Sequence, residues 1–275
     1  MTRRVSIRSA VTLLAIILCF AITNSVITSS VYAQQPQYSF VKKWGSNGIG
    51  FGEFSQPIEI AIDSAGNVYV TDFTSVSNKV QKFASNGTFI TSWGSTGLGD
   101  GQFINPAGMA VDSSGNVYVG DFGENNRVQK FDSNGDFITN WGTPGTGDGQ
   151  FITPADITVD STGNVYVADG GNNRVQKFDS NGNFITKWGT PGTGDGQFAS
   201  PAGITVDSSD NLYVTDTGND SIQKFDSNGN FITKWGSSGS NDGQFLDPLG
   251  IAVDSTGNVY VVDSGNSRIQ VFAPS

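Results

Sequence analysis

The chain is dominated by a tandem repeat. Its five tryptophans lie 49, 48, 47 and 47 residues apart, and each is followed by glycine. They are Trp44, Trp93, Trp141, Trp188 and Trp235. The repeated unit begins at Pro57, Pro106, Pro154, Pro201 and Pro248. A repeat of this length indicates stacked structural units, each too small to bury its apolar residues alone.

Each unit predicts four short β-strands. In the third unit the apolar runs are 156–159, 165–168, 174–178 and 184–188, and they are rich in Val, Ile, Phe, Tyr and Thr. The links between them carry Gly and Asn, which supply the positive φ angles of tight hairpins. Because one small sheet cannot cover both its faces but radial stacking can, we predict an all-β, five-bladed β-propeller of four-stranded antiparallel blades.

The two ends of the repeat region predict how the ring closes. The last unit stops at Phe272 after its third apolar run, and residues 40–45 (FVKKWG) match residues 231–236 (FITKWG). We therefore expect the N-terminal strand to complete the last blade, which removes two open sheet edges. A six-bladed or open arrangement is the alternative.

The N-terminus has the pattern of an export signal. Three arginines within residues 1–10 precede an apolar run at 11–22, and small residues precede a predicted cleavage site after Ala33. We predict a Sec-type signal peptide at 1–33, a single propeller domain at 34–275, and a secreted or extracytoplasmic protein. The apolar run is shorter than the roughly 20 residues that span a bilayer. An uncleaved signal anchor is the alternative.

Composition excludes several functions. The chain has no His, and its one Cys, Cys19, lies within the predicted signal peptide. Catalytic Ser–His or Cys–His pairs and His-ligated zinc are therefore excluded. The net charge of -10 leaves no broad basic surface for nucleic acid. We expect a monomer that needs no cofactor and is not inserted stably in a membrane after cleavage.

A family resemblance follows from the motifs. The segments Gly-Asn-Val-Tyr-Val-x-Asp, Asn-x-Arg-Val-Gln-Lys-Phe and Gly-Asp-Gly-Gln-Phe-x-x-Pro, with Trp-Gly between them, resemble NHL repeats over residues 38–272. The resemblance implies a propeller and, for most members, a binding or scaffolding role. Many members have six blades, so five units are a departure. The amide lyases with NHL repeats bind zinc through His, which this chain lacks.

Several motifs have structural interpretations. The Asp that ends each second strand is followed by a basic residue in most units, as in Asp169 and Arg174, which predicts an ion pair across the hairpin. The loop at 145–149 precedes a strand and not a helix, so it is not a dinucleotide loop. Asp132 begins a hairpin turn that lacks the Gly and Glu of a calcium loop. We expect the tryptophans to pack between blades.

Two acidic residues depart from the repeat in the first strand of their units. Glu59 and Asp156 stand where the other units have Gly. Alternation places them on the same side as small residues such as Ala61 and Ala110, which we expect to line the central channel. Our hypothesis is that the two carboxylates hold a cation, for example Ca²⁺, or ordered water near one mouth. The alternative is that both simply face solvent.

The long loops between blades predict the binding face, because they share one rim with the loops between the second and third strands. Their aspartates are Asp100, Asp148, Asp195 and Asp242. We predict a non-enzymatic binding or scaffold propeller that recognises a protein or surface polymer through this rim. One alternative is a glycan-binding propeller with one site per blade. The other is a divalent-metal-dependent hydrolase resembling the lactonases of six-bladed propellers.

Overall fold

The computed structural model describes residues 40–73 and 78–274, which form five antiparallel sheets. The first sheet consists of β1 (Pro57–Ile62), β2 (Val68–Asp72), β3 (Lys79–Phe83) and β4 (Phe89–Trp93). The second consists of β5 (Asn105–Val111), β6 (Val117–Phe122), β7 (Arg127–Phe131) and β8 (Phe137–Trp141). The third consists of β9 (Pro154–Val159), β10 (Val165–Asp169), β11 (Arg174–Phe178) and β12 (Phe184–Trp188).

The fourth sheet consists of β13 (Pro201–Val206), β14 (Leu212–Asp216), β15 (Ser221–Phe225) and β16 (Phe231–Trp235). The fifth consists of β17 (Pro248–Val253), β18 (Val259–Asp263) and β19 (Arg268–Phe272). Short 3-10 turns lie between the second and third strands of the last three sheets: η1 (Gly170–Asn172), η2 (Thr217–Asn219) and η3 (Ser264–Asn266). The compact unit that contains these five sheets begins at Trp44. No helix among the described residues is long and apolar enough to cross a membrane.

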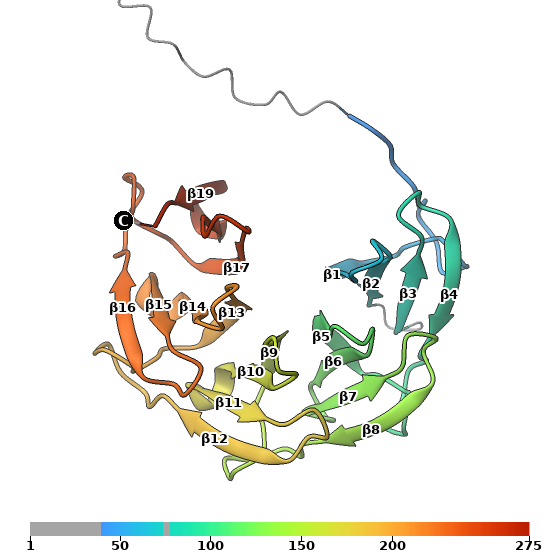
Figure 1. Cartoon of the computed structure of the whole chain (residues 1–275), viewed down its shortest axis with the longest axis horizontal. Helices are drawn as coiled ribbons and strands as arrows, with labels where there is room; N and C mark the ends of the chain where they lie inside the picture. The colour runs from blue at the N-terminus through green and yellow to red at the C-terminus, as the bar shows by residue number, and fades with distance from the viewer. Residues whose placement is uncertain (1–39, 74–77, 275) are drawn as a thin grey trace, which may run out of the picture. The chain divides into compact units, whose positions relative to one another are not determined.

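The sheets are arranged as the blades of a propeller. Each first strand lies nearest the centre and each fourth strand lies on the outside (Figure 1). Neighbouring blades touch in chain order, through β1 with β5, β5 with β9, β9 with β13 and β13 with β17. The predicted all-β, five-bladed architecture is therefore confirmed, and each unit of the sequence is one blade.

Asp side chains shape the hairpins between strands. Asp160 Oδ1 accepts hydrogen bonds from the backbone N–H groups of Thr162 and Asn164, both at 2.9 Å. Gly163 completes the turn with a φ of 86°. The turn sets the pairing of β9 with β10, in which Val159 lies opposite Val165. The Gly- and Asn-rich links thus act as the tight hairpins that the sequence predicts.

Aromatic side chains join one blade to the next. The ring centroid of Trp141 lies 6.2 Å from that of Tyr118 in its own blade and 5.8 Å from that of Phe178 in the following blade. Gly182 lies against the same indole, and an added Cβ there would be 2.5 Å from the ring. The predicted role of the tryptophans in blade packing is confirmed.

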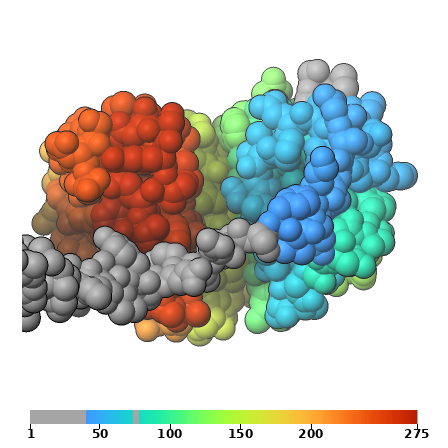
Figure 2. Space-filling view, turned by 90° about the horizontal axis from the view of Figure 1, so that it is seen from above, coloured from blue at the N-terminus to red at the C-terminus, as the bar shows by residue number. Residues whose placement is uncertain are grey.

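The last blade has three strands, not four. Residues 40–44 form no strand, and Phe40 and Val41 are exposed. Figure 1 shows an opening between the last blade and the first, and Figure 2 looks onto it, with the first blade in blue and the last in red. Closure of the ring by the N-terminal strand therefore stays a prediction. The predicted signal peptide lies outside the described residues.

Two glycines separate backbone strain from lost packing. Gly182 and Gly196 both have positive φ, but an added Cβ at Gly196 meets nothing within 4 Å. We expect Gly196→Ala to lower the free energy of unfolding by about 1 kcal/mol through backbone strain alone. Gly182→Ala should cost about 2 kcal/mol more, because its Cβ overlaps the Trp141 ring. Urea unfolding of both variants measures the difference, and equal losses would contradict this account of the blade interface.

Candidate functional site

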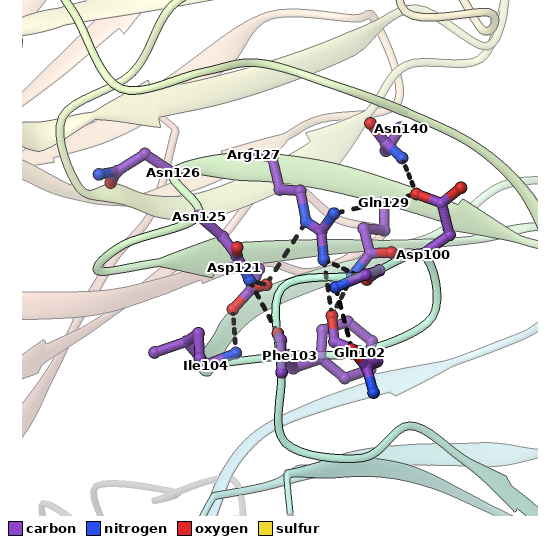
Figure 3. A network of polar contacts seen from close by, with 12 residues as sticks. Asp100, Gln102, Phe103, Ile104, Asp121, Asn125, Asn126, Arg127, Gln129 and Asn140 are labelled. Carbon is purple, nitrogen blue, oxygen red and sulfur yellow. Dashed lines mark hydrogen bonds and ion pairs between the residues drawn. The ribbon is translucent and has the colours of Figure 1, made fainter.

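A buried polar network shapes the rim of long loops (Figure 3). Asp121, at the end of β6, accepts hydrogen bonds from the backbone N–H groups of Ile104 and Asn105 at 2.8 and 2.9 Å. Arg127 on β7 places its Nε 3.6 Å from Asp121 Oδ2 and donates from Nη2 to the carbonyl of Gln102. These contacts fix the loop that leads into the blade against the blade's own second and third strands.

The same network recurs around the propeller. Arg174 Nε lies 2.8 Å from Asp169 Oδ2, and Arg268 Nε lies 2.7 Å from Asp263 Oδ2. In the first blade Lys79 lies 3.9 Å from Asp72. The ion pair predicted across the hairpin is confirmed in these blades. Burial raises the pKa of Asp169, whereas its hydrogen bonds and the charge of Arg174 act to lower it. This carboxylate therefore depends on its partners to stay ionised.

The fourth blade has Ser221 in place of the basic residue. Asp216 there still accepts hydrogen bonds from the side chains of Asn219 and Gln223, at 2.8 and 3.0 Å. Burial raises the pKa of Asp216 as well, opposed by these bonds. The carboxylate is therefore held by amides where the guanidinium is missing, which makes this blade a natural variant of the network.

Sequence reasoning missed the glutamines of this network. Gln176 on β11 donates from Nε2 to the carbonyl of Gln150 at 2.7 Å and accepts from the N–H of Gly149 at 2.9 Å. The equivalent residue of every blade does the same: Gln81, Gln129, Gln223 and Gln270. The available signal was a Gln in the middle of each apolar third strand, since a buried amide must find partners.

The predicted rim aspartates lie in separate loops and do not form one cluster. Most of their partners come from the outer strands, although Asp100 also lies 4.0 Å from Arg127 on β7. Asp100 accepts a hydrogen bond from Asn140 at 2.7 Å. Asp148 pairs with Lys187 at 2.5 Å and Asp195 with Lys234 at 3.1 Å. Within the described part of the chain Asp242 has no side-chain partner. Asp100, Asp148 and Asp195 therefore anchor their loops to outer strands, and all four carboxylates give the rim negative charge.

The rim also has an apolar part, which departs from the repeat. Ile49, Phe51 and Leu98 are 60, 79 and 57% exposed. The third and fourth blades have Thr and Asp at these positions. Phe51 stacks on Phe89 of the outer strand with ring centroids 5.3 Å apart. The long loops of the first two blades thus present an apolar surface beside the acidic loops, and we call these three residues the apolar rim.

The two carboxylates of the first strands, Glu59 and Asp156, lie close enough for the charge of one to affect the other. Asp156 on β9 accepts hydrogen bonds from the N–H groups of Ile157 and Ile204, at 2.8 and 2.9 Å. Burial, followed by the charge of Glu59, raises the pKa of Asp156 to about 8. The intervening blade has Gly108 at this position, where an added Cβ would lie 2.7 Å from Asp156 Oδ1. The glycine leaves room for the carboxylate between the two blades.

One expectation about the inner strands is wrong. Ala110 does not line the channel but belongs to a buried cluster with Ile157 of the next blade. Both faces of a propeller sheet lie against neighbouring blades, so alternate side chains of β5 point to one neighbour or the other and not to the centre. Asp156 follows this rule, since it bonds to β13 of the fourth blade through Ile204.

The hypothesis of a cation held by Glu59 and Asp156 stays a prediction. Burial raises the pKa of Glu59 too. Because the pKa of Asp156 lies near 8, the pair carries fewer than two negative charges at neutral pH. No group of three or more acidic, Cys or His side chains suited to a metal occurs in residues 40–73 and 78–274. Two carboxylates and backbone groups are what the described residues offer a cation here.

The fold and the rim define a class: a β-propeller whose long loops form an ordered surface on one side. The NHL repeat matches residues 103–131, 151–178, 198–225 and 245–272. The chain therefore belongs to the NHL repeat family, as its motifs indicate. No characterised protein with a curated description matches the sequence.

Solved structures with this fold include several kinds of protein. Virginiamycin B lyase from Staphylococcus aureus, in a catalytically inactive histidine-to-alanine form with quinupristin, is 18% identical, with a TM-score of 0.58 over 82% of this chain and 71% of the lyase. A Bacteroides caccae protein of unknown function is 13% identical, with a TM-score of 0.56 over 82% and 73%. A chain of the nidogen–laminin complex is 18% identical, with a TM-score of 0.53 over 79% and 80%. These similarities show the fold alone.

The third blade has Arg174 where the fourth has Ser221, so two substitutions in the third blade can test what the arginine and its aspartate each contribute to stability. Arg174→Ser copies the fourth blade, where amides still satisfy the aspartate, and should lower the free energy of unfolding by about 1–2 kcal/mol. Asp169→Ala leaves the buried Arg174 without its carboxylate and should cost about 3–5 kcal/mol. Urea unfolding measures both values. A larger loss for the arginine variant would show that the guanidinium, and not the carboxylate, is the centre of the network.

Asp156 predicts a dependence of stability on pH. Its folded pKa of about 8 lies above the ordinary value of 3.8, so the folded state holds a proton that the unfolded state releases. Its contribution to stability is therefore full below about pH 4 and is lost as pH rises towards 8. Relative to Asp156→Asn, the wild type should lose roughly 1–3 kcal/mol between pH 5 and pH 8, allowing for partial solvent exposure.

Thermal unfolding between pH 5 and pH 9 measures this difference, and a constant gap between wild type and Asp156→Asn would contradict it. The same experiment with Ca²⁺ tests the cation hypothesis. A bound cation favours the ionised pair, so added Ca²⁺ should raise the unfolding temperature of the wild type most above pH 8 and leave Asp156→Asn unchanged.

Proposed function

We propose that this protein is exported and acts as a binding propeller that recognises a protein or surface polymer through its long-loop rim, without catalysis. The apolar rim supports the proposal most. Ile49, Phe51 and Leu98 are exposed on loops that buried networks hold in place, so the surface is ordered before a partner arrives. Exposed apolar side chains rimmed by polar ones mark interaction surfaces, and rigid aromatic anchors contribute most to binding.

The apolar rim differs from the equivalent positions of the other blades, which also supports the proposed binding role. Residues that only pack the fold need to be the same in every blade, and most of them are. The apolar rim occurs in the first two blades alone, whereas the third and fourth blades have Thr146, Asp148, Thr193 and Asp195 at these positions. A single partner bound off-centre on the rim accounts for this asymmetry better than one identical sugar site in each blade.

The similar lyase does not transfer its activity to this chain. A histidine-to-alanine form of that lyase is catalytically inactive, and this chain has no His. Chemistry that depends on that histidine therefore has no counterpart here. The proposed binding role rests on the rim, and the lyase shares only its fold with this chain.

A variant that makes the apolar rim resemble the third blade tests the proposal. Ile49→Thr, Phe51→Asp and Leu98→Thr are combined, and the protein is immobilised and exposed to a cell-envelope fraction of its own organism. The bound partner is identified by mass spectrometry and its affinity measured by titration. We expect the triple variant to bind at least tenfold more weakly, since each buried apolar side chain contributes about 1–3 kcal/mol.

The control removes three apolar residues of the outer strands that are about half exposed: Ile138→Thr, Ile185→Thr and Ile232→Thr. This variant should keep its affinity within about twofold, since these three side chains do not belong to the apolar rim. Equal binding by the rim variant, or binding only to a glycan array at several equivalent sites, would overturn the proposal in favour of another surface or a glycan-binding function.

A further inference from the structure

The sequence contains two sequons for N-glycosylation, each an Asn followed two residues later by Ser or Thr without Pro between them. They are Asn86-Gly87-Thr88 and Asn219-Asp220-Ser221. Both arise where a blade departs from the repeat. Thr88 stands where the other complete blades have Asp or Asn, and Ser221 stands where three blades have Arg. A folded protein can carry a glycan only where the amide nitrogen reaches solvent, so the surroundings of each sequon decide its use.

The first sequon lies in the hairpin between β3 and β4 and is open to solvent. Asn86 and Thr88 are both exposed. Asn86 Oδ1 accepts a hydrogen bond from the backbone N–H of Thr88 at 2.9 Å, which orients the side-chain amide in an Asx turn. Among the described residues Asn86 Nδ2 has no hydrogen-bond partner. The nitrogen that a glycan would occupy is therefore available.

A second departure from the repeat, two residues earlier, leaves this amide without a competing carboxylate. In the second blade the hairpin begins with Asp132, which accepts from the backbone N–H of Asn134 at 2.8 Å and from its Nδ2 at 3.3 Å. The first blade has Ala84 in place of that aspartate. The turn keeps its shape because the N–H of Gly87 donates to the carbonyl of Ala84 at 2.8 Å. The first blade thus has the hairpin of the others with a free, exposed amide.

The second sequon is closed by the rim network. Asn219 Nδ2 donates to the carbonyl of Gly192 and to Asp216 Oδ2, each at 2.8 Å, so both of its N–H bonds are used. Ser221 is only 6% exposed and is the first residue of β15. A glycan on Asn219 would replace one of these N–H groups and place a bulky polar chain inside the network. The folded fourth blade therefore excludes modification at Asn219.

The hairpin of Asn86 lies at the end of its blade away from the long-loop rim. Lys79, the first residue of β3, donates from Nζ to the carbonyl of Ile49 in the rim loop at 2.8 Å. The turn that contains Asn86 follows Phe83, the last residue of the same strand. A strand of this length separates its two ends by roughly 13 Å. A glycan on Asn86 would therefore leave the apolar rim uncovered.

We propose that Asn86 is an N-glycosylation site and that the folded, exported protein carries a glycan there and not on Asn219. Such a glycan rests on the export that is part of the proposed function. In the transfer, Asn86 Nδ2 forms a bond to the anomeric carbon of the sugar and loses a proton. The bond between that carbon and the phosphate oxygen of a lipid-linked oligosaccharide breaks, and the lipid phosphate leaves with the bonding electrons.

Mass spectrometry of the protein purified from its own organism tests the proposal. Trypsin separates the two sequons, because the cleavage sites place them on peptides 83–127 and 188–224. We expect most copies of peptide 83–127 to carry the added mass of a glycan and peptide 188–224 to have the mass of its sequence alone. An unmodified peptide 83–127 from exported protein would overturn the proposal, and so would a glycan on Asn219.

Variants within the hairpin separate N-glycosylation from other modifications. Thr88→Ser keeps the hydroxyl group of the sequon and should keep the glycan. Thr88→Val has a similar shape without the hydroxyl and should lower the modified fraction at least about tenfold, as should Asn86→Gln. The matched control is Asn134→Gln in the same turn of the second blade, which should leave the glycan unchanged. A modification that persists in Asn86→Gln or Thr88→Val would assign it to another residue and overturn the proposal.

Two further measurements distinguish a failure at Asn86 from a failure of the proposed function. Cell fractionation locates the protein: retention inside the cell would overturn both export and the glycan, whereas exported protein without a glycan would overturn the glycan alone. Binding of the rim partner is then compared between wild type and Asn86→Gln. The affinities should agree within about twofold, because the glycan and the rim lie at opposite ends of the blade. Binding that changes more than this would overturn the placement of the glycan away from the rim.

Discussion

The structure depends on the contact between neighbouring blades. A four-stranded sheet of five-residue strands has two faces and no interior, so each blade becomes stable only when both faces are covered. Tryptophan contributes to this covering, because one indole reaches Tyr118 in its own blade and Phe178 in the next, and Gly182 must stay small beneath it. Strand length, hairpin chemistry and repeat spacing all serve to place this side chain. The exposed faces of the first and last blades correspond to faces that neighbouring blades cover elsewhere in the propeller.

The rim owes its shape to a second layer of interactions. Asp121 accepts hydrogen bonds from the long loop of its blade and Gln129 donates one to it, which holds the loop against the second and third strands. Arg127 contacts both Asp121 and the loop (Figure 3). A loop held in this way presents its exposed residues without a large ordering cost on binding. Ile49, Phe51 and Leu98 are exposed on such loops, so the departures from the repeat at these positions support the proposed binding role.

Acidic residues occupy at least three different structural environments in this chain, which cannot be distinguished from the composition alone. The aspartates of the hairpins accept backbone N–H groups and lower the cost of tight turns. Those at the ends of the second strands are buried and depend on arginine and amide partners. Asp156 lies between blades, where its raised pKa couples protonation to packing near the channel. Net negative charge is therefore mostly structural in origin.

The sequence by itself determined the five units, the strands within them, the hairpin turns and the ion pair of Asp169 with Arg174, because these depend on local spacing that repeats without change. Only the tertiary structure decided which residues face a neighbouring blade, so the expectation that Ala110 lines the channel was wrong. Gln176 was missed for the same reason: a polar residue in an apolar strand has no assigned partner until the preceding loop folds over it. The effect of Glu59 on Asp156 likewise depends on two units that are far apart in the chain and close only around the ring.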